Sequence, residues 1–408
     1  MSPATATGAG PLAGLVVVDL SRALAGPHAT MMLGDLGARI IKIEAPGAGD
    51  DTRGWGPPFV VPEGKAYAVQ PPGPPAPGRE STYFLAANRN KESVVLDLKD
   101  PVDKDVLLGL LDGADVLVEN FRTGVLDRLG LGFASLHERN PRLVILSITG
   151  FGHDGPEGGR AGYDQIAQGE AGLMSLTGSG PQDPQKSGPP VCDLLAGMYG
   201  AYGLLAALLE RERTGRGSVV RTSLLAAGVG VHAFHGTRWT IAGEVSRALG
   251  NHHASISPYG LFACRGGAVQ IAVGSEGLWR AFCAGFGLDP FAPGMATNAE
   301  RVANREAVIA AIDAVFATWD PEPLLTRLAE VGIPAGKVRS LDDVYAWDQT
   351  RSQGLVVSVE HPTLGTLELP GPPLRFFDAD GTEVTRTAHT PPPTLGQHTD
   401  AARAQVQR

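Results

Sequence analysis

The feature that most constrains this fold is an alternation of strand-like and helix-like segments in the first 150 residues. Leu15–Leu20 and Ile40–Glu44 are short β-branched runs typical of buried strands, and the stretch from His28 to Leu36 is predicted to form a helix after a turn at 25–27. Strands that alternate with helices build a parallel sheet with helices on both faces. We therefore predict an α/β fold, continued by strands at 94–98, 116–119 and 143–148 and by a helix at 101–111.

The second half of the chain changes in character after about residue 225. A strand is predicted at 268–273 and a helical region from Glu300 to Val331, and strand-like segments return from Val356 onward. This pattern predicts a smaller domain, residues 226–340, inserted into a large domain formed by residues 1–225 and 341–408. Residues 61–78 are rich in Pro and Gly, so we expect an exposed or disordered loop that forms no strand ladder.

The composition argues against several classes of function. The chain has 34 basic and 43 acidic residues, and its net charge of −9 argues against a general nucleic-acid binder. Cys192, Cys264 and Cys283 are too widely spaced for a disulfide framework or a zinc site. The first ten residues lack the basic and apolar regions of a signal peptide. We therefore expect a cytoplasmic protein with no metal ion and with neither nucleic acid nor membrane as a partner.

Asp193 stands alone at the start of a long apolar segment. Between Leu194 and Leu209 no side chain is charged, and the prolines before the segment and Gly215 after it are typical signals for the ends of a helix. A helix that is apolar on all sides is buried, and this run is shorter than the roughly 18 to 20 residues of a membrane span. Because Asp is a favoured N-cap residue, a purely structural role for Asp193 is one interpretation. A functional carboxylate is the other.

Two further motifs do not support the function that each would suggest, and a third motif is absent. Gly150–Gly155 matches the dinucleotide pattern G-x-G-x-x-G, but Pro156 and two more glycines follow, so no helix can begin there to meet a pyrophosphate. His232, His235 and the pair at 252–253 have no carboxylate or cysteine at a ligand spacing. No G-x-S-x-G motif is present, which removes the commonest serine-hydrolase mechanism.

The segment Asn120–Arg128 follows a predicted strand. Ligands in open α/β sheets bind outside the carboxyl ends of the strands, where this segment is expected to lie. Phe121 offers a stacking surface and Arg128 a partner for a phosphate. Taken alone, these residues leave a nucleotide-phosphate site open without deciding for it. Asn88–Lys91, by contrast, is expected to form a polar turn before a strand, with Lys99 solvated.

A series of short motifs, in a fixed order along the chain, gives it a resemblance to a known family. They are Pro11–Gly14, Gly34–Ala38, Ile41–Glu44, Asp51–Trp55, Asn88–Lys91, Val118–Phe121, Arg128–Gly130, Gly162–Asp164, Arg213–Gly217, Gly332–Gly336 and Leu395–Asp400. With these motifs the chain resembles the class III coenzyme A transferases, the superfamily of formyl-CoA transferase, carnitine-CoA transferase and α-methylacyl-CoA racemase. The resemblance implies a Rossmann-like large domain built from both chain ends, a smaller α+β domain and an interlocked homodimer. It implies acyl-CoA and a carboxylic acid as substrates, with no permanently bound cofactor.

The resemblance also assigns roles to individual residues. Asp193 occupies the position of the nucleophile, whose carboxylate forms an aspartyl anhydride and then an aspartyl-CoA thioester. We expect its place at a helix N-terminus to favour the ionised form, and nearby backbone N–H groups to stabilise the oxyanions. Asp164 matches an acidic position beside it. The implied CoA contacts are Arg22, Ala23, Ala25, Leu96, Lys99, Asn120, Phe121, Val125, Arg128, Asp164 and Leu224.

Two other functions stay open within the resemblance. A racemase needs a second base, a His, on the far side of the substrate, and Tyr163 stands at that position here, so transfer is favoured. A catalytically silent CoA-binding dimer is the third hypothesis. Arg22 and Leu24 replace a His and a Gln of formyl-CoA transferase, which argues against formyl or oxalyl specificity. We expect succinyl-CoA and another dicarboxylate instead, with Arg22 able to meet a second carboxylate.

Overall fold

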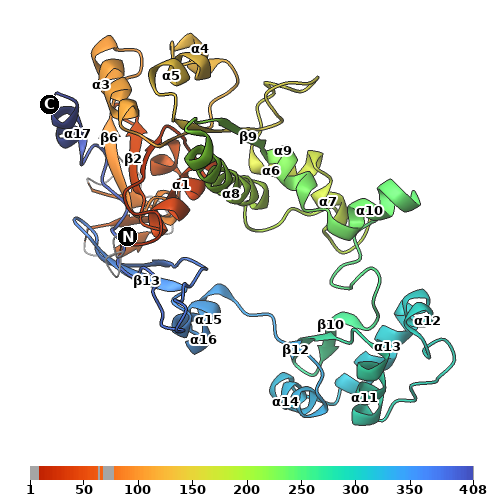
Figure 1. Ribbon diagram of the computed structural model, residues 1–408. Helices are drawn as coiled ribbons and strands as arrows, with labels where there is room; N and C mark the ends of the chain where they lie inside the picture. The colour runs from red at the N-terminus through yellow and green to blue at the C-terminus, as the bar shows by residue number, and fades with distance from the viewer. Residues whose placement is uncertain (1–8, 63–64, 68–77, 408) are drawn as a thin grey trace. The chain divides into compact units, whose positions relative to one another are not determined.

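The computed structural model describes residues 9–62, 65–67 and 78–407 of the chain. The chain forms two compact units. The first comprises Met1–Gly172, Gly188–Ala233 and Asp348–Arg408, and the second comprises Leu173–Ser187 and Phe234–Trp347. The two ends of the chain thus contribute to one unit (Figure 1), whereas residues 173–187, which the sequence-based division assigned to the large domain, group with the second unit.

A six-stranded parallel sheet forms the centre of the first unit (Figure 1). Its strands lie in the order β6-β2-β1-β7-β8-β9, and every neighbouring pair is parallel. Numbered within the sheet, this is the 3-2-1-4-5-6 order of dinucleotide-binding folds. The predicted α/β fold with a parallel sheet is confirmed. The strands are β1 (Val16–Asp19), β2 (Arg39–Glu44), β6 (Lys91–Val95), β7 (Val116–Glu119), β8 (Val144–Thr149) and β9 (Val219–Ser223).

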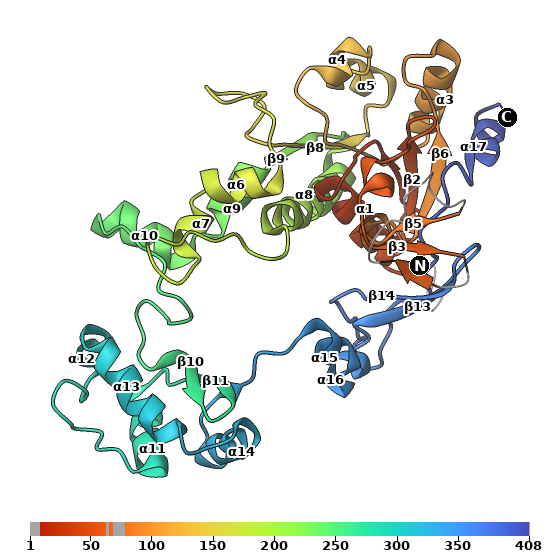
Figure 2. The same cartoon turned by 180° about the vertical axis from the view of Figure 1, so that it is seen from behind.

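Helices cover both faces of this sheet. Successive side chains of a strand point to opposite faces, so a strand of apolar residues presents an apolar surface on each side that helices bury. Val18, Ile41 and Leu117 belong to a buried cluster that includes residues of four helices on one face. Leu146 lies on the other face, directly against α8. Figure 2 shows α3 and α17 side by side, as does Figure 1. The first face is covered by α3 (Pro101–Asp112), α4 (Val125–Arg128), α5 (Phe133–Arg139) and α17 (Thr399–Val406), and the second by α1 (Ala25–Asp35) and α8 (Val191–Thr214).

Three glycines allow α8 to approach the sheet and α1 closely. A Cβ atom at Gly197 would lie 2.6 Å from the carbonyl oxygen of Ala25, and one at Gly200 would lie 2.8 Å from Leu146 Cδ2. A Cβ atom at Gly203 would meet a side chain of β9 at 2.7 Å. These glycines, which interrupt the apolar run in the sequence, therefore form the packing surface of the helix.

The opposite face of α8 is exposed, which corrects the prediction that the whole helix is buried. Met198, Tyr202, Leu205 and Leu209 recur every three or four residues, and all are exposed in the single chain, Tyr202 by 73%. The helix has 24 residues and is long and apolar enough to cross a membrane by composition, although the shorter uncharged run suggested otherwise. A core helix can have the same length and composition, and the inner face of α8 packs on the sheet.

Shorter elements connect the strands of the first unit. β3 (Phe59–Val61) pairs antiparallel with β4 (Lys65–Tyr67) and β5 (Glu80–Ser81). The prediction that residues 61–78 form no ladder is therefore wrong at 65–67, where the backbone groups pair with β3; residues 63–64 and 68–77 lie outside the described residues. The other short elements are η1 (Asp51–Gly54), α2 (Thr82–Ala87), α6 (Asp164–Glu170), α9 (Leu224–Gly230), α16 (Asp348–Ser352), β13 (Val356–His361) and β14 (Gly365–Pro370).

The second unit has a three-stranded antiparallel sheet in the order β10-β11-β12, of which Figure 2 labels β10 and β11. Its buried core includes Phe262, Trp279 and Phe316. The predicted strand at 268–273 corresponds to β11, and the predicted helical region divides into three helices. The elements of this part of the chain are α7 (Leu173–Leu176), α10 (Ala233–Ala242), β10 (Tyr259–Cys264), β11 (Gly267–Ala272), α11 (Glu276–Phe286), α12 (Asn298–Ala303), α13 (Arg305–Phe316), α14 (Pro321–Val331), β12 (Ala335–Gly336) and α15 (Leu341–Ala346).

Candidate active site

The first turn of α8 is capped by a residue from another helix. Pro190 occupies the N-cap position, so Asp193 is the third residue of α8. The Oδ1 atom of Asp164, the first residue of α6, accepts hydrogen bonds from the backbone N–H groups of Cys192 at 2.8 Å and Asp193 at 3.2 Å. The interpretation of Asp193 as the helix cap is therefore wrong. Over the described residues, the Asp193 carboxylate itself forms no hydrogen bond or ion pair.

Burial, and then the charge of Asp164, raise the pKa of Asp193 to about 7. The prediction that the helix N-terminus favours the ionised form is wrong, because the N–H groups at that terminus are bonded to Asp164 instead. Asp193 therefore titrates near neutral pH. A strongly perturbed acid in a partly buried position is typical of a functional site, and its carboxylate is more basic than that of an ordinary Asp.

Tyr83, on α2, belongs to the same environment and was not predicted from the sequence. Burial, and then the charges of Asp193 and Asp164, raise the pKa of Tyr83 to about 12, so its phenol stays protonated as a hydrogen-bond donor. Its ring packs edge-on against Trp55 with the ring centroids 5.1 Å apart. Burial and the same two acids raise the pKa of Cys192 to about 11, which keeps its thiol from acting as a thiolate. No local pattern marks Tyr83, because only folding brings it near the two acids.

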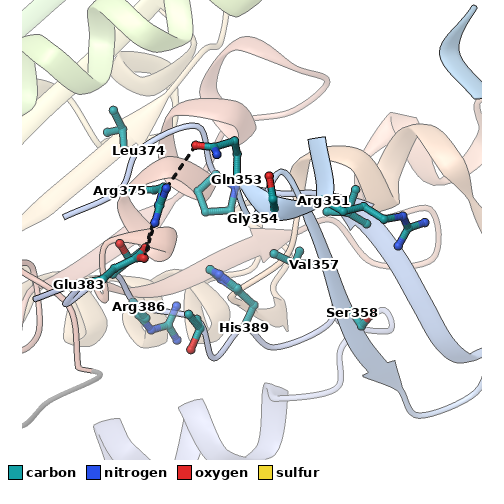
Figure 3. A pocket seen from close by; sticks show the side chains of 15 residues that line it. Arg351, Gln353, Gly354, Val357, Ser358, Leu374, Arg375, Glu383, Arg386 and His389 are labelled. Carbon is teal, nitrogen blue, oxygen red and sulfur yellow. Dashed lines mark hydrogen bonds and ion pairs between the residues drawn. The ribbon is translucent and has the colours of Figure 1, made fainter. Parts of the chain in front are cut away.

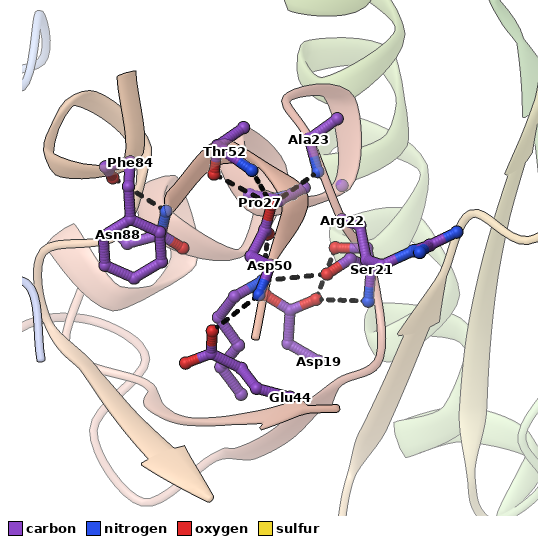
Figure 4. A network of polar contacts seen from close by, with 12 residues as sticks. Asp19, Ser21, Arg22, Ala23, Pro27, Glu44, Asp50, Thr52, Phe84 and Asn88 are labelled. Atoms are coloured by element: carbon purple, nitrogen blue, oxygen red, sulfur yellow. Dashed lines mark hydrogen bonds and ion pairs between the residues drawn. The ribbon is translucent and has the colours of Figure 1, made fainter. Parts of the chain in front are cut away.

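The turn after β1 is fixed by buried polar groups (Figure 4). The N–H group of Ser21 donates to Asp19 at 2.9 Å, and its carbonyl accepts from Lys42 Nζ at 2.8 Å. The N–H group of Ala23 donates to Asp50 Oδ1 at 3.2 Å. Lys42 and Asp50 form an ion pair of 2.8 Å in which the side chains are 1% and 0% exposed. Burial alone would lower the pKa of Lys42, but the carboxylates of Asp50 and Asp19 raise it, so the lysine is charged.

The backbone of this turn is also strained and bridged. Ala23 has a φ of 63°, in the left-handed region that residues with a Cβ atom rarely adopt. The N–H group of Arg22 donates to Asn120 Oδ1 at 2.8 Å, and its carbonyl accepts from Asn120 Nδ2 at 2.7 Å. Asn120 therefore joins the turn after β1 to the loop after β7. The turn predicted at 25–27 is the first turn of α1, which begins at Ala25.

A cavity of about 260 Å³ lies beside this turn, at the carboxyl ends of β1, β2, β6 and β7. Doubly wound sheets bind ligands at this edge. Most of the lining is apolar, and the guanidinium of Arg22 lies 5.8 Å from the centroid of the Phe121 ring. Such a cavity suits a planar heterocycle with phosphates attached. Five of the predicted CoA contacts line it: Arg22, Leu96, Lys99, Phe121 and Val125.

The other predicted contacts lie elsewhere in the first unit. Ala23 and Ala25 belong to the turn and the start of α1, and Asp164 acts on α8. Arg128 is exposed at the end of α4 and does not line the cavity. Leu224 does not line it either: it is buried at the start of α9, directly after β9. Because β9 is an edge strand with β8 between it and β7, its end lies away from the four strands that border the cavity.

The nucleophile candidate and the cavity are linked through α1. Gly197 lies one helical turn after Asp193, and its contact with Ala25 brings this part of α8 against the residue that follows the turn after β1. Over residues 9–62, 65–67 and 78–407, no group of three or more His, Cys, Asp or Glu side chains is placed to hold a metal ion. The fold and the site together define an α/β enzyme. It has a cavity suited to a ring with phosphates, lined by Leu96, Phe121 and their neighbours and called the nucleotide-type cavity below, and an acid with a pKa of about 7.

Known proteins make this class specific. The model of CoA-transferase family III matches residues 12–399. The succinyl-CoA:glutarate CoA-transferase of Mus musculus is 38% identical over 391 residues, which cover 95% of this chain and 85% of that protein. The succinate–glutarate CoA-transferase of Agrobacterium fabrum is 37% identical over 400 residues, 95% of this chain and 94% of that protein. A CAIB/BAIF family protein from Brucella suis matches with a TM-score of 0.82 and 36% identity, over 97% of this chain and 99% of that chain. The chain therefore belongs to CoA-transferase family III, and it is a CoA-transferase.

Proposed function

We propose that Asp193 is the nucleophile that carries CoA from an acyl-CoA donor to a carboxylic acid. The observation behind this proposal is that two acids have different places at the start of α8: one caps the helix and the other does not. Asp164 caps α8, which leaves the carboxylate of Asp193 unbonded over the described residues and with a pKa of about 7. An acid that only capped its helix would accept those N–H groups itself.

The reaction proceeds by four acyl transfers. The Asp193 carboxylate attacks the donor thioester, and the CoA thiolate leaves as a mixed aspartyl anhydride forms. The thiolate attacks the aspartyl carbonyl, which gives an aspartyl-CoA thioester and releases the donor acid. The acceptor carboxylate attacks this thioester, which gives a new anhydride and frees the thiolate again. The thiolate then attacks the acceptor carbonyl, so acyl-CoA leaves and Asp193 regains its carboxylate.

The developing oxyanions need hydrogen-bond donors. The N–H groups of Cys192 and Asp193, which an N-terminal turn would ordinarily offer, are bonded to Asp164. We assign this role to Tyr83, because the charges of Asp193 and Asp164 both act on its phenol and its pKa of about 12 keeps the proton in place.

The substrates follow from relatives and from the position of Arg22. The two named relatives act on succinyl-CoA or succinate together with glutarate, and we propose a succinyl-CoA donor and a dicarboxylate acceptor for this chain. Arg22 lines the nucleotide-type cavity and pairs with Asp51 at 3.3 Å. It therefore serves CoA in this proposal rather than the second carboxylate of the acceptor.

A homodimer is part of the proposal because of the outer face of α8. Met198, Tyr202, Leu205 and Leu209 form an exposed apolar stripe on that helix, and a second copy of the chain would remove it from water.

The nucleophile assignment is tested by replacing Asp193 with Asn and with Ala. Both variants should lose CoA exchange between succinyl-CoA and glutarate, followed by mass spectrometry, by a factor on the order of 10³ or more. CoA binding, measured by calorimetry, should be unchanged, because Asp193 is not among the residues that line the cavity. The matched control is Glu170→Gln on α6, an exposed acid paired with Arg160 at 2.5 Å, which should keep full activity. Substantial exchange by either Asp193 variant contradicts the proposal.

A further inference from the structure

A second cavity, of about 380 Å³, lies in the first unit between β13 and the segment that follows β14 (Figure 3). It is separate from the nucleotide-type cavity, with which it shares no lining residue. Figure 3 shows the imidazole of His389 among the lining side chains, with Arg386 on one side of it and Val357 on the other. The charged and hydrogen-bonding groups of the lining include Arg351, Arg375, Glu383, Arg386, Thr387 and His389.

The three arginines of this cavity differ in their counter-ions. Arg351 pairs with Glu368 at 3.0 Å, and Arg375 pairs with Glu383 at 2.5 Å. Arg386 has no carboxylate within ion-pair distance over the described residues; its Nη1 atom donates to the carbonyl of Gly34 at 3.0 Å. The guanidinium is partly buried, and that burial lowers the pKa of Arg386. The cavity thus contains one cation that no acid neutralises.

Asp35 is the nearest acid to influence Arg386, but it is already engaged. It accepts both guanidinium N–H bonds of Arg89, at 2.7 and 2.6 Å, and a bond from Asn90 Nδ2 at 2.8 Å. These bonds engage the Asp35 carboxylate, which also lies 3.5 Å from His389 Nδ1, so Arg386 has no carboxylate partner of its own over the described residues.

His389 adds a donor without an acceptor. Its side chain is 2% exposed, and its Nδ1 atom lies 3.1 Å from Asn90 Nδ2. Because an amide nitrogen only donates, Nδ1 is the accepting atom and Nε2 carries the proton of the neutral ring. Burial lowers the pKa of His389, which keeps the ring neutral. Over the described residues Nε2 has no hydrogen-bond partner, although leaving a buried donor unpaired costs about 1–3 kcal/mol.

From these two unsatisfied groups we propose that this cavity is a binding site for a small oxyanion, a carboxylate or a phosphate. In this proposal its oxygens bond to the guanidinium of Arg386 and accept the Nε2–H group of His389, which lines the same cavity. The hydroxyl of Thr387 lies in the same lining. One negative charge compensates Arg386, because Arg351 and Arg375 have acidic partners. The proposal concerns binding alone and does not depend on the nucleophile assignment.

The test is calorimetric titration of the full chain, saturated with CoA, with inorganic phosphate and separately with succinate. Arg386→Gln should weaken the binding of one or both anions about tenfold or more, the factor expected for one lost charge-assisted hydrogen bond. Glu383→Gln should strengthen binding several-fold, because it frees Arg375 from its carboxylate. Arg139→Gln, which breaks an exposed pair with Asp112 far from β13, is the matched control and should change nothing.

The two anions identify the source of the ligand, since phosphate binding points to a phosphorylated metabolite and succinate binding to a carboxylic acid. If Arg386→Gln fails to fold, Arg386→Lys retains the charge and should retain binding, and Glu383→Gln still carries its opposite prediction. Equal affinity in the chain and in its Arg386 and Glu383 variants overturns the proposal, as does the absence of binding by both anions.

Discussion

The turn after β1 and the first turn of α8 are neighbours in the fold, yet they treat buried charge in opposite ways. Around the turn, Lys42 pairs with Asp50 and Lys91 with Asp19, and all four side chains are at most 1% exposed. On α8, Asp193 lies near another acid and has no ion pair over the described residues. Paired ions fix geometry, whereas burial, and then the charge of Asp164, raise the pKa of Asp193. The comparison separates a rigid turn, held by buried ion pairs, from a buried acid with a raised affinity for protons.

Breaking one of the buried ion pairs around the turn after β1 should have the largest effect on stability. Lys42→Met leaves Asp50 buried without its cation and removes the donor to the Ser21 carbonyl. We expect a loss of about 3–5 kcal/mol in the free energy of unfolding, because an uncompensated buried charge is left behind. Urea denaturation measures it. Arg139→Gln, in an exposed pair, should cost only about 0–1 kcal/mol, and a similar loss in both variants would contradict the rigid role of Lys42.

The second largest effect is expected at the contact between Gly197 of α8 and Ala25, which joins the two regions. A Cβ atom at Gly197 would lie 2.6 Å from the carbonyl oxygen of Ala25, a backbone atom that cannot move away freely. Gly197→Ala should therefore destabilise the chain by about 1–3 kcal/mol and lower the exchange rate, because α8 shifts relative to the turn. Gly277→Ala in α11 is the control: its Cβ atom would meet only Ser275 Oγ at 3.7 Å, so no loss is expected. Equal thermal midpoints for the two variants would show that α8 absorbs the methyl group.

The sheet and the ligand edge could be predicted from the sequence, because both depend on local patterns. β-branched runs that alternate with helices specify a parallel sheet, and the sheet specifies that ligands bind after its strands. Phe121, which follows β7, therefore lies at this edge, and Leu96, which the resemblance assigned to the same pocket, lines the same cavity. Leu224 does not, because proximity to a cavity depends on strand order, and β9 lies at the far edge. The exposed stripe of α8 was missed for a similar reason, since an all-apolar helix does not show which face the sheet covers.

The electrostatics of the candidate site could not be predicted, because they depend on contacts between distant residues. Asp164 and Asp193 are 29 positions apart in the sequence. Only folding brings the carboxylate of Asp164 to the N–H groups of α8, the helix that contains Asp193. The sequence suggested that Asp193 would be both cap and catalyst. In the structure the cap is Asp164, which leaves Asp193 for the nucleophile role that we propose, and the pKa of Asp193 rises where the helix terminus alone would have lowered it.

The smallest effects are expected from the pH dependence of Asp193, the acid without an ion pair over the described residues, and a pH profile of the exchange rate measures it. Attack requires the ionised carboxylate, so the exchange rate should rise with pH through about 7, the pKa of Asp193. Stability has the opposite sign. The folded-state pKa lies above the ordinary value of 3.8, so the contribution of Asp193 to stability is fully present below about pH 4 and is lost as the pH rises through about 7. Asp193→Asn should remove that part of the pH dependence in urea denaturation.

Asp164→Asn tests the second cause of the raised pKa. An Asn carbonyl still accepts the N–H groups of Cys192 and Asp193, so the cap of α8 persists while its charge is removed. The midpoint of the rate profile should move down by about one pH unit. It should stay above 3.8, because burial, the larger cause, remains. Glu170→Gln, at the other end of α6, should leave the midpoint unchanged. A midpoint that does not move in Asp164→Asn would mean that burial alone sets the pKa, and that Asp164 positions the helix without tuning its acid.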